Sequence, residues 1–181
     1  MAKRNLRVLH FGGGPAIYDL ISAAPYAEKI IFAEYSEENR KEVAAWRERS
    51  PDAHDWSPYF RFVLQRLGGK GSEQALRKKI THILPCDIAL EDPVKWPSTW
   101  TSQLGSFDVV TTSLCLEAAV KSEVEYRDAI AKLKKYLKPG GFRHRRDFLL
   151  CRQGKVLLPF RKRESNQRNL MPGGLWWCGH E

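Results

Sequence analysis

A short apolar run at residues 6–11 ends abruptly at three consecutive glycines, Gly12, Gly13 and Gly14. Such a run predicts a buried strand that enters a tight turn. After the turn, apolar residues recur at helical spacing through Ala24, so we expect a helix there. A second apolar run at 29–33 ends at Glu34, and Ser36 is typical of the start of a helix that continues to about Arg49. This βαβα order favours a parallel sheet with right-handed crossovers.

The later part of the chain continues the alternation less regularly. We expect a helix over 60–67, and a helix from Leu76 through Ile80 and Ile83 that runs into a short strand at 82–86. Pro85 limits that strand to a sheet edge or to its own end. A long connection at 89–106 precedes a strand at 107–113 and a helix at 126–137. We therefore predict an α/β, Rossmann-like domain with about five strands and helices on both faces of a mostly parallel sheet.

Composition restricts the class of protein. The 181 residues suffice for one domain, with 43% hydrophobic and 28% charged residues, as is ordinary for a globular chain. No apolar run reaches the roughly 18 residues of a membrane helix, and the first one is too short for a signal peptide. The four cysteines form no CxxC pair, so we expect neither a zinc site nor disulfides, and we expect a cytoplasmic location.

The net charge of +9 is unevenly distributed. Residues 143–181 contain nine Lys/Arg and three Asp/Glu, whereas the other residues contain 21 and 18. After Phe142 we expect the next strand, but the polar run 143–146 cannot lie in the buried centre of a parallel sheet. We therefore divide the chain into a domain at 1–142 and an atypical basic tail at 143–181 with no core-facing stripe. A nucleic-acid partner for that tail remains an alternative.

Gly12, Gly14 and Glu34 together predict a nucleotide-like ligand. Glycines between strand and helix let a ligand approach the backbone, and an acid at the end of the next strand can bind ribose hydroxyls. Ile17 occupies the place of the third glycine of the dinucleotide fingerprint and Pro15 enters the turn, which disfavours a pyrophosphate and a nicotinamide-dependent oxidoreductase. The competing interpretation is a turn that only needs positive φ angles.

Asp87 ends the third strand, on the side of the sheet where Gly12 and Glu34 are expected. A carboxylate there can accept a hydrogen bond from an exocyclic amine such as that of adenine. The alternative is a turn cap before Leu90.

The chain resembles the S-adenosylmethionine-dependent methyltransferases, and within them the nicotinamide, phenylethanolamine and indolethylamine N-methyltransferase family. The resemblance extends over residues 6–142. The motifs that carry it, in order, are His10-Phe11-Gly12-Gly13-Gly14-Pro15-Ala16-Ile17-Tyr18, Glu34-Tyr35-Ser36-Glu37-Glu38-Asn39, Asp55-Trp56-Ser57-Pro58, Cys86-Asp87-Ile88, Ser113-Leu114-Cys115-Leu116-Glu117-Ala118-Ala119 and Leu137-Lys138-Pro139-Gly140-Gly141-Phe142. His10 departs from the family, which has an acid at that position.

The resemblance implies a role for each motif. Gly12 and Gly14 would pass beneath the amino-acid portion of S-adenosyl-L-methionine, Tyr18 would contact its carboxylate region, and Ser113 would face its methionine part. By the same resemblance, four further residues would surround the nucleoside: Glu34 at the ribose hydroxyls, Asn39 near ribose or adenine, and Asp87 and Ile88 beside the adenine.

The implied activity is methyl transfer to the nitrogen of a small amine or pyridine, by a monomer without a membrane partner. No catalytic acid or base is assigned, because a pyridine nitrogen carries a free lone pair. Relative to the family we expect truncation at both ends, with residues 143–181 arising from an altered reading frame or an unspliced segment. The alternatives are a non-catalytic derivative that binds the cofactor, and a nucleic-acid-binding protein acting through the basic tail.

Overall fold

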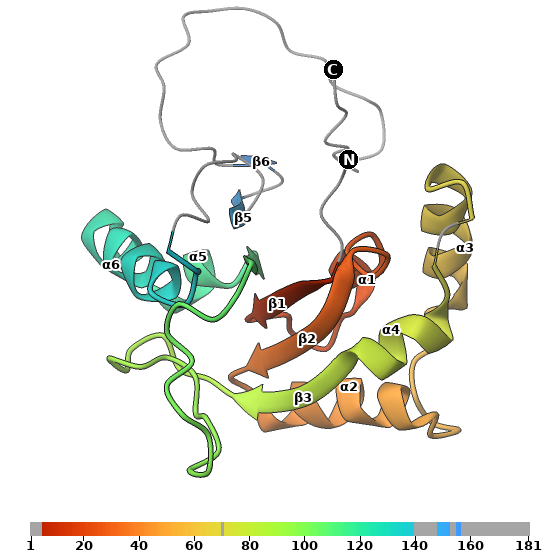
Figure 1. Ribbon diagram of the computed structural model, residues 1–181, viewed down its shortest axis with the longest axis horizontal. Coiled ribbons are helices and arrows are strands. Elements are labelled where there is room, and N and C mark those ends of the chain that lie inside the picture. Colours follow the sequence, from red (N-terminus) through yellow and green to blue (C-terminus); the bar gives the residue numbers. More distant parts are fainter. Residues whose placement is uncertain (1–4, 70, 140–147, 153–154, 157–181) are drawn as a thin grey trace, which may run out of the picture.

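The computed structural model describes residues 5–69, 71–139, 148–152 and 155–156 (Figure 1). Over these residues the strands form one sheet in the order β3-β2-β1-β4-β5-β6. The pairs among β1 to β5 are parallel, and β6 runs antiparallel to β5. The strands are β1 (Leu6–Phe11), β2 (Ala27–Glu34), β3 (Ile80–Pro85), β4 (Val109–Ser113), β5 (Phe148–Arg152) and β6 (Lys155–Val156).

Two hydrophobic clusters lie on opposite faces of this sheet. Strand residues alternate between them: Val8, Ile30 and Phe32 belong to one cluster, and Leu9 and Ile31 to the other. Such alternation follows from the two-residue period of a strand. The described helices are α1 (Tyr18–Ile21), α2 (Glu37–Glu48), α3 (Ser57–Arg66), α4 (Glu73–Lys79), α5 (Leu116–Ala119) and α6 (Glu123–Lys134).

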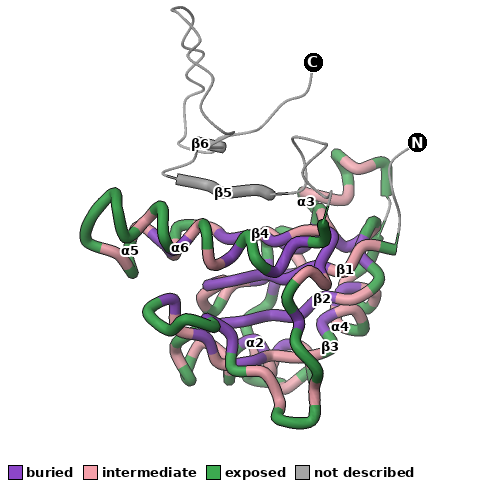
Figure 2. Tube along the Cα trace, turned by 60° about the vertical axis from the view of Figure 1, so that its left-hand side comes forward, coloured by how far each residue is buried: buried purple, intermediate pink, exposed green. Residues whose placement is uncertain are grey.

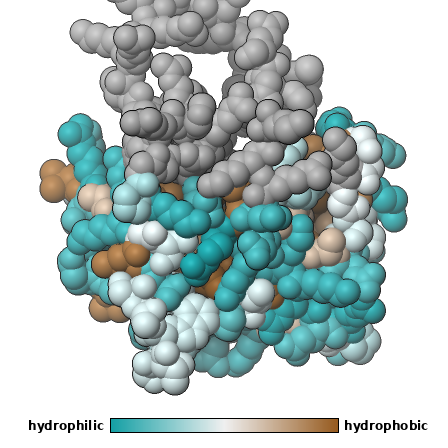
Figure 3. Space-filling model, viewed as in Figure 1, coloured by the Kyte–Doolittle hydropathy of each residue, from teal (hydrophilic) through white to brown (hydrophobic). Residues whose placement is uncertain are grey.

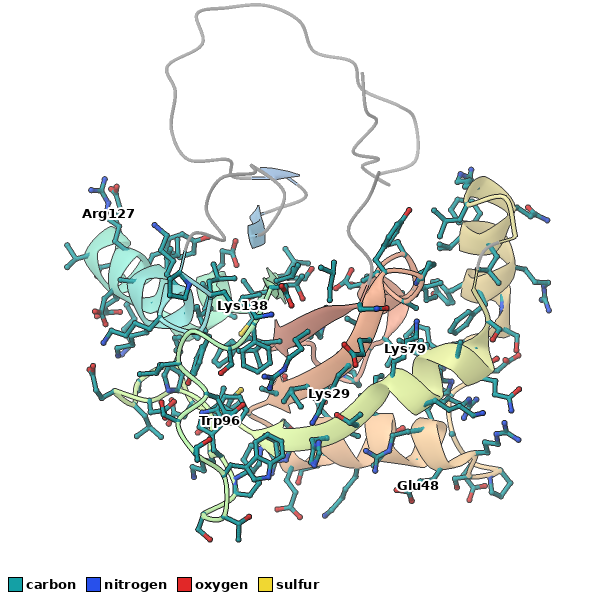
Figure 4. All side chains as sticks on the ribbon, viewed as in Figure 1. Lys29, Glu48, Lys79, Trp96, Arg127 and Lys138 are labelled. Atoms are coloured by element: carbon teal, nitrogen blue, oxygen red, sulfur yellow. The ribbon has the colours of Figure 1, made fainter. Side chains whose placement is uncertain are left out.

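The helices divide between the two faces. Buried residues of α1, α2, α3 and α4 join the first cluster, and those of α5 and α6 join the second. In the tube of Figure 2, buried positions concentrate on the strands between these layers. Trp96, labelled in Figure 4, packs on the second face with Trp100, Phe107 and Tyr136. The predicted Rossmann-like α/β fold, with helices on both faces of a mostly parallel sheet, is confirmed.

Local signals explain the helix starts. Ser36 accepts a hydrogen bond from the Asn39 amide, Ser72 from Ala75 and Ser122 from Glu125, each in the geometry of an N-cap.

Hydrophilic side chains dominate the described surface in the view of Figure 3, with apolar ones scattered among them, as is normal for a folded chain.

Several helix boundaries differ from the prediction, among them those of α3, which begins at Ser57, and of α6, which spans Glu123–Lys134. The helix expected to reach Ala24 ends at Ile21, and turns follow it in which the Ala24 amide still donates to the Leu20 carbonyl at 2.9 Å. The helix expected to contain Ile80 and Ile83 ends at Lys79 instead. Ile80 begins β3, where it pairs with Ile30 of the neighbouring strand. Pro85 is the last residue of β3 at the sheet edge, as predicted.

The position of the fifth strand was also predicted wrongly. We expected a strand to start at Phe142 or not at all, whereas β5 pairs with β4 at 148–152, inside the range assigned to a tail without a core-facing stripe. The pairing of Val110 with Phe148 begins this ladder. The proposed reading-frame origin of 143–181 concerns residues that lie mostly outside the described ones.

Candidate functional site

The glycine turn after β1 is fixed by packing as well as by backbone conformation. Gly12 has a φ of +68°, and a Cβ atom at this residue would lie 2.0 Å from Cys115 Sγ. A Cβ at Gly13 would lie 2.5 Å from His10 Nε2 and 2.6 Å from Phe32 Cζ. Real Cβ atoms do not approach so closely, so both residues must be glycine for this turn to form.

Gly14 differs from the other two. It has a φ of +62°, but a Cβ there would meet no atom within 4 Å. The space beside Gly14 is therefore open. The Gly14 backbone has the left-handed conformation that is required both by the ligand-binding interpretation and by the interpretation of a turn that only needs positive φ angles. Sequence patterns identified Gly12 and Gly14 but missed Gly13, whose constraint comes from the side chains of two neighbouring strands.

Glu34 closes the turn from the β2 side. Its Oε2 accepts a hydrogen bond from the Gly14 amide at 3.0 Å, and its Oε1 accepts bonds from the Ser36 amide and Asn39 Nδ2, each at 3.0 Å. The side chain is buried, with 6% of the residue exposed. A carboxylate can accept about four hydrogen bonds, so Oε2 retains capacity for a ligand hydroxyl. Three predicted site residues, Gly14, Glu34 and Asn39, are thus directly connected.

Asp87 lies at the end of β3, as predicted, and its Oδ1 accepts a hydrogen bond from the Ala89 amide at 2.9 Å. The Leu90 amide also bonds to the Asp87 carbonyl, at 3.2 Å. The turn-cap alternative is therefore present, and the adenine contact stays a prediction. Ile88 is buried in the cluster on the α6 face, and its carbonyl accepts from Lys132 Nζ at 3.2 Å.

A hollow of about 590 Å³ lies at the ends of β2 and β3. Its described lining includes Tyr35, Ser36, Arg40, Asp87 and Lys95. Arg40 is tied to the backbone there, since its Nη1 donates to the carbonyl of Glu34 at 2.8 Å. Sequence patterns missed Arg40 and Lys95. Lys95 belongs to the long connection and approaches β3 only in the fold.

Tyr18 and Asp19 begin α1 after the turn, and Ser113 belongs to β4. Tyr18 is 42% exposed, and its ring lies 6.1 Å from Trp56 and 6.4 Å from Tyr59. Ser113 is the last residue of β4. Burial raises the pKa of Asp19 above its ordinary value. Nothing in the sequence singled out Asp19, because a polar residue in a first helical turn is commonplace.

His10 lies beneath the turn, buried between β2 and β4. Nδ1 shares a 2.8 Å hydrogen bond with Thr111 Oγ1, while Nε2 has no partner among the described residues. Burial lowers the pKa of His10 to about 4, so the ring is neutral at neutral pH. The residue that departs from the family pattern thus contributes no charge to the turn.

Two cysteines lie beside the same turn. Burial raises the pKa of Cys115 to about 11 and that of Cys86 further, so both remain thiols at neutral pH.

Within the described ranges, no group of three or more His, Cys, Asp or Glu side chains is arranged to hold a metal ion. None of the described helices combines the length and apolar character needed to cross a membrane.

The arrangement corresponds to the ligand crevice of doubly wound sheets. The chain leaves β1 toward the α1 face and leaves β4 toward the α6 face, so the carboxyl ends of these two strands form a topological switch point. Gly12 and Ser113 immediately follow the paired residues Phe11 and Thr112 at that point. Glu34 and Asn39 lie at the end of β2, and Asp87 and Ile88 follow β3. Ser113 ends β4, whereas Gly14 is hydrogen-bonded to Glu34 and Tyr18 begins α1.

Comparison with known proteins gives a consistent result. The sequence model of the NNMT/PNMT/TEMT family matches residues 2–149. Nicotinamide N-methyltransferase of Sus scrofa is 34% identical over 139 residues, which cover 75% of this chain and 51% of that protein. Indolethylamine N-methyltransferase of Mus musculus is 33% identical over 138 residues, which cover 74% of this chain and 50% of that protein. Phenylethanolamine N-methyltransferase of Mus musculus is 30% identical over 139 residues, with 74% and 46% covered. The chain spans about half the length of the curated relatives it matches.

Proposed function

The chain belongs to the NNMT/PNMT/TEMT family, and we propose that it binds S-adenosyl-L-methionine and transfers its methyl group to the nitrogen of a small amine or pyridine. Nicotinamide, indolethylamine and phenylethanolamine, which name its relatives, define the substrate class to be tested. The observation that carries the proposal is the direct connection of Gly14, Glu34 and Asn39 at the open side of the turn.

The residues present fit this cofactor. The open face at Gly14 admits a ligand against the backbone, and the buried Glu34 carboxylate has acceptor capacity for a ribose hydroxyl. Asp87 lines the hollow at the ends of β2 and β3, which offers room for a purine beside the Asp87 carboxylate. Gly12, Gly14, Tyr18 and Ser113 would hold the amino-acid part, and Glu34, Asn39, Asp87 and Ile88 the nucleoside. When bound, the cofactor would supply an electrophilic methyl group on a sulfonium.

The chemistry requires the protein mainly to align two reactants and exclude water. Alignment alone can contribute effective molarities of ~10⁵ M or more. Rigid elements favour such alignment, since the Glu34 carboxylate at the end of β2 holds the Gly14 amide of the turn by a hydrogen bond. A pyridine acceptor needs no general base, whereas an alkylammonium must first lose a proton to solvent or to a basic group.

Calorimetric titration with S-adenosylhomocysteine tests cofactor binding directly, and turnover with S-adenosylmethionine and the three acceptors then tests the activity. Binding with turnover of at least one acceptor supports the proposal. Binding without turnover favours the non-catalytic derivative, and absence of binding refutes the proposal.

Glu34→Ala should weaken S-adenosylhomocysteine binding by about 1–3 kcal/mol, the cost of leaving ligand hydroxyls without a charged acceptor. Because Glu34 also holds the amides of Gly14 and Ser36, this variant should lose stability as well. Glu34→Gln is the matched control, since it keeps an amide oxygen as acceptor at similar volume. An unchanged dissociation constant in a folded Glu34→Ala protein would contradict the ribose assignment.

A further inference from the structure

Two consecutive residues at the start of α2 bind Glu34 from its opposite ends. Asn39 Nδ2 donates to the carboxylate Oε1 at 3.0 Å, and Arg40 Nη1 donates to the main-chain carbonyl at 2.8 Å. The same nitrogen of Arg40 donates to the carbonyl of Tyr35 at 2.6 Å. The guanidinium therefore joins the last residue of β2 to the first residue after it.

Arg40 binds these carbonyls and not a neighbouring carboxylate. Glu37 and Glu38 lie in the same turn of α2, but among the described residues no ion pair includes Arg40. Glu37 pairs with Lys41 instead, at 2.7 Å. A hydrogen bond from a charged donor is roughly twice as strong as a neutral one, so the end of β2 is held firmly.

The main chain at Glu34 decides where the Glu34 carboxylate lies. The Cys86 amide donates to the same carbonyl at 3.2 Å, so Arg40 and the residue after β3 together fix this point of the backbone. The carboxylate then lies with its Oε2 3.0 Å from the Gly14 amide, beside the open space of the turn. Hydrogen bonds weaken steeply when their angles change, so a shift at the end of β2 would misplace the carboxylate for a ligand hydroxyl.

Arg40 also lines the hollow at the ends of β2 and β3, together with Asp87 and Lys95. Its Nη1 is occupied by two carbonyls of the protein. Holding the end of β2 accounts for the bonds that Arg40 makes, whereas a direct contact with a purine would have to use another nitrogen of the guanidinium.

We propose that Arg40 is a positioning residue for the nucleoside of the cofactor: its guanidinium fixes the main chain at the end of β2, so that Glu34 presents Oε2 to a ribose hydroxyl. The inference rests on the proposed function and adds to it the residue that prepares the ribose contact. Arg40 acts through Glu34 in this scheme and does not touch the ligand. Its loss therefore affects ligands that carry the ribose hydroxyls and spares those that lack them.

The test compares two ligands by calorimetry on the full chain, wild type and Arg40→Met. The ligands are S-adenosylhomocysteine and its dideoxy analogue, which has hydrogen in place of both ribose hydroxyls. Methionine keeps a long apolar stem but removes every donor. We expect the substitution to weaken S-adenosylhomocysteine binding by about fivefold or more, and to change binding of the dideoxy analogue by less than about twofold. A general loss of structure would lower both affinities by the same factor.

Three further variants complete the comparison. Arg40→Lys retains a cation with several donors and should restore most of the affinity for S-adenosylhomocysteine. Arg47→Met removes the arginine in the last turn of the same helix, where it pairs with Glu48 at 3.0 Å, and should leave both affinities unchanged. Arg40→Gln is shorter and uncharged, and the same difference between the ligands is expected of it if Arg40→Met does not fold.

Equal weakening of both ligands by Arg40→Met would overturn the inference, since it would show a direct purine contact or a general loss of structure. Unchanged affinity for S-adenosylhomocysteine would overturn it as well. In both cases binding of S-adenosylhomocysteine by the wild-type chain leaves the proposed function intact. If the wild-type chain does not bind S-adenosylhomocysteine, the proposed function itself fails and the inference fails with it.

Discussion

Acidification should destabilise this protein through His10. The ring is 1% exposed and burial lowers its pKa from 6.5 to about 4. Below pH 6.5 the unfolded chain therefore binds a proton that the folded chain does not bind, and the free energy of unfolding must fall as pH falls. The stability that depends on a neutral His10 ring is fully present above pH 6.5, the pKa in the unfolded chain. It is lost progressively as the pH falls toward about 4, the pKa in the folded chain.

The magnitude follows from the two pKa values. One pKa unit corresponds to about 1.4 kcal/mol, so the loss reaches about 2 kcal/mol at about pH 5. The perturbation that isolates it is His10→Asn, which removes the titrating ring while retaining a polar group that can reach Thr111. The difference in unfolding free energy between wild type and variant should shrink by about 2 kcal/mol between about pH 7.5 and about pH 5.

Urea denaturation at a series of pH values measures this difference directly. His82, whose pKa is also lowered by burial, is present in both proteins and cancels, as do the carboxylates. His54→Asn, at an exposed histidine, is the matched control and should preserve the wild-type pH dependence. Parallel stability curves for wild type and His10→Asn would contradict this account, because they would show that the His10 pKa is the same in the folded and unfolded chain.

Gly12→Ala should destabilise the fold by more than about 2 kcal/mol and more than Gly14→Ala does, since the former adds a collision with Cys115 Sγ to a positive φ and the latter adds only the backbone strain. Equal losses of stability in urea would argue against this difference. NAD should not displace S-adenosylhomocysteine in a competition titration, because Pro15 enters the turn and the buried Ile17 occupies the third glycine position. Displacement at micromolar NAD would revive the oxidoreductase alternative. A chain ended after residue 142 should be less stable than one ended after residue 156 by at least about 1 kcal/mol, because β5 then no longer pairs with β4. Identical melting temperatures of the two truncations would show that this pairing contributes nothing.

Local patterns in the sequence were sufficient to identify three residues that the fold brings together. The apolar run before the glycines, the acid that ends the next strand and the serine cap at Ser36 each depend on neighbouring residues, and the structure has Gly14, Glu34 and Asn39 hydrogen-bonded together. The family follows from motifs of the same kind, which the comparisons confirm. The ligand contacts of the eight predicted site residues remain predictions.

The parallel sheet and its two-faced packing could be predicted from the order of apolar runs alone, because alternation of strand and helix admits few topologies. The contacts between residues far apart in the sequence could not be predicted in this way. Cys115 forbids a side chain at Gly12, and Val110 pairs with Phe148, each across a long stretch of chain. No local period encodes such contacts, since burial and strand pairing depend on the whole sheet. For that reason the helix after Leu76 was extended too far and β5 was misplaced.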